Sequence, residues 1–208
     1  MSNQLLQYGP YVVPTHNTYF IDYYYKTKAF DDFKIQKIEN YVNSNLNFQK
    51  GLTSGQTLNM PKEELHRTSN RNIAYISPTP DTQWLYEFLF PIALEANRQL
   101  FGFDIDFVTD PIHYIIYPED GGHLGYHMDI GNGVNTRKLA MTIQLSDPHE
   151  YEGGNFDIWQ GGKDIVKTLP REKGDIIVFP VWLMHKISPI TKGQRKCLVF
   201  WTGGRPFK

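Results

Sequence analysis

The C-terminal half of the chain alternates apolar and polar residues with a period of two, and this pattern constrains the fold most. In residues 139–145 the odd positions are apolar, which predicts a strand with one buried face. Glycines occur between successive apolar segments, as is typical of tight turns. Many short strands without intervening helices predict an antiparallel barrel or sandwich. Further strands are expected over residues 155–160, 165–169, 175–179 and 196–202.

The first hundred residues have a different texture and predict two helices. Apolar residues recur at helical spacing over residues 30–46 and again over residues 81–99. Pro91 is expected to kink or divide the second helix, because proline has no N–H to donate. Residues 73–77 could form a short strand. The helices are expected to cover one face of the sheet.

Composition narrows the classes of function. Lys and Arg number 21 against 22 Asp and Glu, a net charge of −1, so nothing indicates a nucleic-acid or anionic-membrane partner. One cysteine excludes an intramolecular disulfide framework and a Cys-rich zinc finger. Neither a membrane helix nor a convincing signal peptide is evident in the text. We expect one cytoplasmic domain over residues 1–208, with residues 1–100 as helical support and substrate-side loops, and residues 101–208 as the β core.

Two of the seven histidines stand out by their context. His127 and Asp129 are two residues apart, so in extended backbone both side chains point to one side and can chelate a cation. His185 follows a predicted strand and could complete the set from a neighbouring strand. Two imidazoles and one carboxylate, with open positions opposite, are the ligand set of non-haem Fe(II) oxygenases. A His-x-Asp pair alone is weak evidence for a metal.

Arg195 gives a second, independent indication. It lies ten residues after His185, at the start of the last apolar strand. An arginine that points into a barrel is costly unless it meets an anion. A bidentate clamp on a carboxylate is the obvious use.

With these residues in view, the run from Tyr114 to Gly204 resembles the Fe(II)- and 2-oxoglutarate-dependent dioxygenases of the prolyl 4-hydroxylase type, including compact bacterial and phage PKHD-type hydroxylases. The features occur in family order and at family spacing. They are Tyr117-Pro118, His127-x-Asp129, the strand Arg137 to Asp147, Tyr151-Glu152-Gly153-Gly154, Gly174-Asp175, Phe179-Pro180, His185-x-Ile187-x-Pro189-Ile190 and Lys192-Gly193-x-Arg195.

The resemblance implies a double-stranded β-helix, or jelly roll, that is mainly β with flanking N-terminal helices. It implies that residues 101–208 are the catalytic jelly-roll core. His127, Asp129 and His185 would be the iron ligands.

The resemblance also implies how the co-substrate is held. Arg195 would bind the C5 carboxylate of 2-oxoglutarate, and Tyr117 would hydrogen-bond the same molecule. Gln144 aligns with a tyrosine that contacts the co-substrate in some relatives. Trp201 falls where relatives often carry an aromatic residue near the metal.

The residues that would contact the primary substrate are less specific. Prolyl 4-hydroxylases often carry an Arg-x-Ser element, for which either Arg67 with Ser69 or Arg71 alone could be the equivalent. Tyr126 and Trp182 could contact a peptide, as aromatic residues do in peptide clefts.

The implied activity is hydroxylation of an unactivated C–H bond, first of all in a prolyl residue of a peptide or protein. It would need Fe(II), 2-oxoglutarate and O2, with ascorbate as an optional reductant, and would release succinate and CO2. A free amino acid, a small metabolite or a modified nucleotide remains an alternative substrate, although the near-neutral charge disfavours nucleic acid. A non-catalytic jelly-roll binding module and a zinc hydrolase rank lower. A binding module would not need the three ligands and Arg195 together, and a zinc hydrolase would leave Arg195 unexplained.

Overall fold

The computed structural model describes residues 5–8, 11–14, 22–53, 59, 61, 63, 66–131, 135–161 and 166–206. Both predicted helices are present, as α1 (Asp32–Asn45) and α3 (Gln83–Ala96), and α3 continues into a π-helical turn, η1 (Asn97–Phe101). Asp31 caps α1, because its carboxylate accepts a hydrogen bond of 2.8 Å from the backbone N–H of Lys34.

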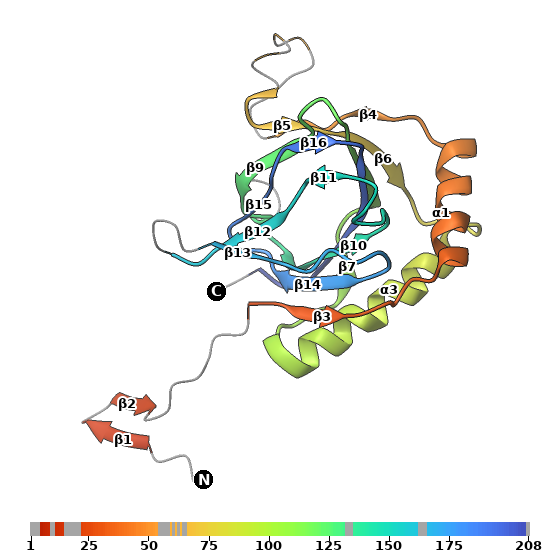
Figure 1. Ribbon diagram of the computed structural model, residues 1–208. Helices are drawn as coiled ribbons and strands as arrows, with labels where there is room; N and C mark the ends of the chain where they lie inside the picture. The colour runs from red at the N-terminus through yellow and green to blue at the C-terminus, as the bar shows by residue number, and fades with distance from the viewer. Residues whose placement is uncertain are drawn as a thin grey trace.

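Two antiparallel sheets form the centre of the fold (Figure 1). The larger sheet has the order β3 (Tyr24–Lys26), β14 (Ile176–Pro180), β10 (Arg137–Gln144), β17 (Arg195–Gly203), β8 (Ile112–Tyr117), β6 (Asn72–Ile76) and β4 (Gln49–Lys50), and β7 (Phe107–Val108) also pairs with β17. The smaller sheet has the order β13 (Val166–Thr168), β12 (Phe156–Trp159), β15 (His185–Ile187), β9 (His123–His127) and β5 (Ser69–Asn70). Two short pairs complete the set, β11 (Glu152–Gly153) with β16 (Ile190–Lys192), and β1 (Leu5–Tyr8) with β2 (Tyr11–Pro14).

This arrangement is the predicted jelly roll, mainly β with flanking helices. Every strand expected in the C-terminal half is present, with bounds shifted by at most a few residues. The N-terminal part contributes more than the expected helical layer. It supplies β3, β4 and β6 to the larger sheet and β5 to the smaller one. Its strands therefore take part in both walls of the sandwich.

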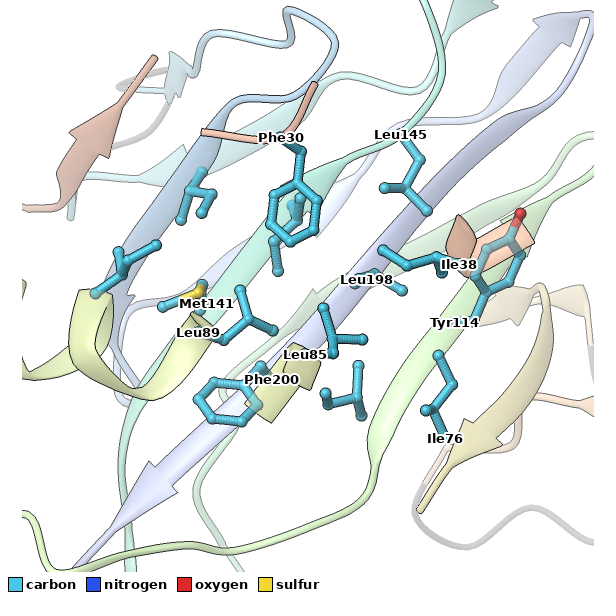
Figure 2. Packing of buried hydrophobic residues seen from close by; sticks show 14 of the residues in the cluster. Phe30, Ile38, Ile76, Leu85, Leu89, Tyr114, Met141, Leu145, Leu198 and Phe200 are labelled. Carbon is cyan, nitrogen blue, oxygen red and sulfur yellow. The ribbon is translucent and has the colours of Figure 1, made fainter. Parts of the chain in front are cut away.

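The helices cover the outer face of the larger sheet and bury a first core there. Figure 1 shows α1 and α3 on the side of the sandwich away from β9, β12 and β15. Leu85 and Leu89 of α3 pack with Met141 of β10 and Phe200 of β17, as Figure 2 shows. Pro91 lies inside α3 and does not divide it, so division, one of the two expected effects, is absent. The proline lies on the exposed side of the helix, where solvent can hydrate the carbonyl that loses its donor.

A second core fills the space between the two sheets. Ala140 of β10 belongs to it, whereas the neighbouring Met141 faces the helices. Strand β10 thus buries both faces, and the expectation of a single buried face was wrong because the helices cover the outer side. None of the described helices is both long and apolar enough to cross a membrane.

Phe200 tests the packing between helices and sheet. Phe200→Ala should lower the free energy of unfolding by about 3–5 kcal/mol, because the ring is fully buried and its loss leaves a cavity. Phe33→Ala is the matched control and should change it by less than about 0.5 kcal/mol, since Phe33 is 78% exposed. Urea unfolding measures both. Equal effects would contradict the assigned core.

Candidate active site

Strand pairing brings the predicted triad together. In the smaller sheet β9 runs antiparallel to β15 with His127 directly opposite His185. Asp129 follows β9, and its backbone N–H donates to the carbonyl of Val181 at 2.8 Å. One ligand atom from each of the three side chains lies within 4.8 Å of the others, so together they could hold a metal ion. The three residues that the sequence predicted as neighbours thus lie close together.

Both imidazoles are oriented by backbone carbonyls. Nδ1 of His127 lies 2.9 Å from the carbonyl of Gly125, and Nδ1 of His185 lies 2.8 Å from that of Leu183. A carbonyl only accepts, so each neutral imidazole carries its proton on Nδ1 and leaves the Nε2 lone pair free. These Nε2 atoms lie 3.4 Å and 3.9 Å from the oxygens of Asp129. The three donor atoms therefore converge.

The charges suit a divalent cation. Burial lowers the pKa of His185 to about 4, with the charge of His127 acting in the same direction, so this imidazole is neutral at pH 7. Burial by itself raises the pKa of the Asp129 carboxyl. The hydrogen bond with His127 and the charges of the two histidines outweigh it and hold that pKa well below its usual range. A neutral imidazole and an ionised carboxylate are the forms that bind metals.

A layer behind Asp129 holds the carboxylate in place. The indole Nε1 of Trp201 donates to Asp129 Oδ2 at 3.0 Å. The guanidinium of Arg137 lies 4.3 Å from the centre of the Trp201 ring and donates to both carboxylate oxygens of Asp110, at 2.9 and 2.7 Å. Trp201 was predicted near the metal; the roles of Arg137 and Asp110 were not, since nothing in their spacing distinguishes a half-buried ion pair from surface charges.

The triad opens into a cavity of about 760 Å³ between the sheets, and Arg195 lines it with Tyr117. Arg195 is 3% exposed, and its guanidinium carbon lies 5.4 Å from the centre of the Tyr117 ring. Its guanidinium donates to the sulfur of Cys197 at 3.6 Å and interacts with the side chain of Tyr151, and its Nε has no partner. No carboxylate lies within ion-pair distance of it among the described residues. Such a cation calls for an anionic ligand.

Gln144 lies apart from this cavity. Its amide nitrogen donates to the carbonyl of Ser146 at 3.2 Å and to the hydroxyl of Tyr151 at 3.0 Å. Thr142, two residues earlier in β10, lines the cavity instead. Alternate residues of a strand share a face, so sequence alignment alone could not separate these two positions.

The structure divides the residues predicted to contact substrate. Arg67, Arg71 and Tyr126 line the cavity, as Trp201 does. Trp182 is not among the lining residues, and its ring packs edge-on against Phe103 at 5.1 Å between centres. The hydroxyl of Ser69 is buried and donates to the carbonyl of Gly51, which disfavours an Arg-x-Ser element at Arg67.

Comparisons with known proteins agree with this site. The profile of the 2OG-Fe(II) oxygenase superfamily matches residues 112–203, which include the whole triad and Arg195. A PKHD-type hydroxylase of Pseudomonas putida is 35% identical over 92 residues, which are 40% of this chain and 39% of that protein. The chain thus spans about two fifths of the length of such curated relatives.

Solved structures share the fold. A prolyl hydroxylase from Trichoplax adhaerens, in complex with a hypoxia inducible factor peptide fragment, superposes with a TM-score of 0.70 at 15% identity, covering 88% of this chain and 83% of that one. A prolyl-4-hydroxylase from Pseudomonas putida gives 0.65 at 15% identity, covering 88% and 93%. These structures share the fold of this chain, and the sequence match to the 2OG-Fe(II) oxygenase profile covers residues 112–203.

The unpaired Arg195 predicts a change in stability. Arg195→Met should raise the free energy of unfolding by about 1–4 kcal/mol in the absence of ligands, because it removes an uncompensated buried charge and keeps the volume. Arg137→Met is the contrasting variant. It should lower that free energy by about 1–3 kcal/mol, since it leaves Asp110 without its partner. Urea unfolding of both variants measures the difference, and a destabilised Arg195→Met would show that this arginine is already paired.

Proposed function

We propose that residues 1–208 act as a single Fe(II)- and 2-oxoglutarate-dependent dioxygenase domain. It hydroxylates an unactivated C–H bond in a prolyl residue of a peptide or protein and releases succinate and CO2. The observation that carries this proposal is the meeting of His127, Asp129 and His185 with the unpaired, buried Arg195 in one cavity.

The donor set fits iron. Two neutral imidazoles and one ionised carboxylate on one side of a site leave the opposite positions open, as non-haem Fe(II) oxygenases require. His127, Asp129 and His185 would hold the ion. When bound, Fe(II) would supply the activation of O2 that couples decarboxylation of 2-oxoglutarate to C–H hydroxylation. A zinc hydrolase would leave Arg195 without a role.

The chain's own residues position and shield the reactants. Arg195 would hold the C5 carboxylate of 2-oxoglutarate through charge-assisted hydrogen bonds. Burial raises the pKa of Tyr117, so its hydroxyl stays protonated and can donate to the same carboxylate. The rings of Phe156 and Phe179 pack at 5.3 and 4.8 Å from that of His185, and they keep water away from this side of the site.

The choice of a prolyl substrate rests on similarity. Two of the structures that share the fold are prolyl hydroxylases, one of them in complex with a peptide fragment, and the relatives in sequence are PKHD-type hydroxylases. Retention of the triad and of Arg195 argues against a non-catalytic binding module. Ascorbate as reductant, the cytoplasmic location, and the lack of nucleic-acid and membrane partners stay predictions.

An anaerobic titration tests the metal and co-substrate sites together. The protein should develop a weak visible charge-transfer band only when both Fe(II) and 2-oxoglutarate are added, because the co-substrate must chelate the bound ion. Asp129→Ala should abolish the band and succinate release, since it removes one of three ligands. The control Asp81→Ala lies at an exposed position outside the cavity and should retain both. A band in the folded Asp129→Ala variant would refute the ligand set.

A second prediction separates co-substrate binding from metal binding. Arg195→Gln should raise the KM for 2-oxoglutarate by roughly 10- to 100-fold, because a charge-assisted contact to the carboxylate is lost. The affinity for Fe(II) should change by less than about threefold, since Arg195 is not a ligand. Lys192→Gln, at an exposed position of β16, is the control. An unchanged KM would assign Arg195 a structural role.

A further inference from the structure

Arg71 occupies the corner at which the chain passes from one sheet to the other. The two residues before it form β5, which pairs with β9, the strand that carries His127. The residues after it form β6, which pairs with β8, the strand that carries Tyr117. Because the active-site cavity lies between the sheets, a side chain at this corner can reach into it, and Arg71 is one of the lining residues.

The corner is held firmly. Asn70 is buried, and its amide nitrogen donates to the backbone carbonyl of Asp120 at 3.0 Å. The backbone N–H of Gly51 donates to the carbonyl of Arg71 at 2.9 Å. Gly51 packs directly against the Arg71 side chain, and a Cβ added at Gly51 would lie 2.6 Å from Arg71 Cγ and Nε. The direction of the Arg71 side chain is therefore set by the fold.

The Arg71 guanidinium is poorly satisfied. It donates to the carbonyl of Leu52 over 3.5 Å and interacts with the side chain of Tyr117, and its Nε is buried without a partner. No carboxylate forms an ion pair with it among the described residues, and the one acidic side chain among the residues that line the cavity is Asp129. Of the other lining arginines, Arg137 is neutralised by Asp110, Arg195 is buried, and Arg67 is exposed. The wall around Arg71 thus has an excess of positive charge.

Arg71 and Arg195 lie on opposite sides of Tyr117. The register of β17 with β8 places Arg195 across from Tyr117, and that of β6 with β8 continues to Arg71 on the other side. Arg195 is buried, whereas Arg71 is half-buried and is joined in the lining by the exposed Arg67 and Thr68. A co-substrate bound at Arg195 would leave Arg71 on the side from which a second molecule enters.

We propose that Arg71 binds a carboxylate of the primary substrate, so that the enzyme selects a substrate with an acidic group close to the carbon that is hydroxylated. This inference rests on the proposed dioxygenase function. The acidic group is either an Asp or Glu side chain beside the target residue of a peptide or the α-carboxylate of a free amino acid. Both present the same planar anion to the guanidinium fork.

Matched probes test the selection. Succinate release is measured with short proline-containing peptide amides that carry Glu or Gln beside the proline, and with L-proline or L-prolinamide. In the wild type, the acidic member of one pair should have a KM roughly 10- to 100-fold lower than its uncharged partner. The pair that shows the preference identifies the source of the carboxylate. Equal KM values, or no stimulation by either acidic probe, overturn the inference.

Variants tie the preference to Arg71. Arg71→Gln should reduce the ratio of the two KM values to within about twofold, and Arg71→Lys should restore part of it, since a charge without the fork remains. Gly51→Ala should also reduce the ratio, because its Cβ displaces the arginine without removing the charge. Arg98→Gln, at an exposed position of η1, is the matched control and should keep the wild-type ratio.

The same data distinguish the failures. If Arg71→Gln raises the KM for 2-oxoglutarate as much as that for the acidic probe, Arg71 serves the co-substrate and the inference is overturned. Uncoupled succinate release by the wild type without any acidic preference overturns this inference and leaves the dioxygenase proposal standing. A folded, Fe(II)-loaded wild type that releases no succinate overturns both.

Discussion

The pairing of β9 with β15 is the interaction on which the candidate site depends. It sets His127 opposite His185, and the hydrogen bond from Asp129 to the carbonyl of Val181 brings the carboxylate against both rings. Two strands more than fifty residues apart in the chain thus converge through their backbone pairing. The rest of the sandwich holds this pair flat against the larger sheet, from which Trp201 reaches Asp129.

The sequence predicted the parts of the molecule whose signal is local or periodic. Alternation found the C-terminal strands, helical spacing found α1 and α3, and the chelating step from His127 to Asp129 was readable from two residues. The same signals could not show that β10 is covered on both faces, because odd apolar positions are equally compatible with one buried face or two. They also could not show that Thr142 rather than Gln144 faces the cavity, since both share one parity.

Contacts between distant charges lay beyond sequence reasoning for another reason. Arg137 and Asp110 form a bidentate pair behind Trp201, yet neither residue differs in its local sequence from a charge on the surface. Arg195 was recognisable because an arginine in an apolar strand conflicts with burial. In the structure, no described carboxylate pairs with the buried Arg195. The residue is therefore costly for stability and informative about function.

Arg71 extends this reasoning to the substrate side of the cavity. A buried or half-buried cation without a carboxylate partner indicates an anionic ligand, and the described residues of the cavity include two such cations, Arg71 and Arg195, on either side of Tyr117. A dicarboxylate co-substrate can satisfy Arg195 with one end while its other end chelates the metal, and then no free carboxylate is left for Arg71. A second anion must therefore come from the molecule that is oxidised. Neutralisation of both arginines thus calls for two different anionic ligands.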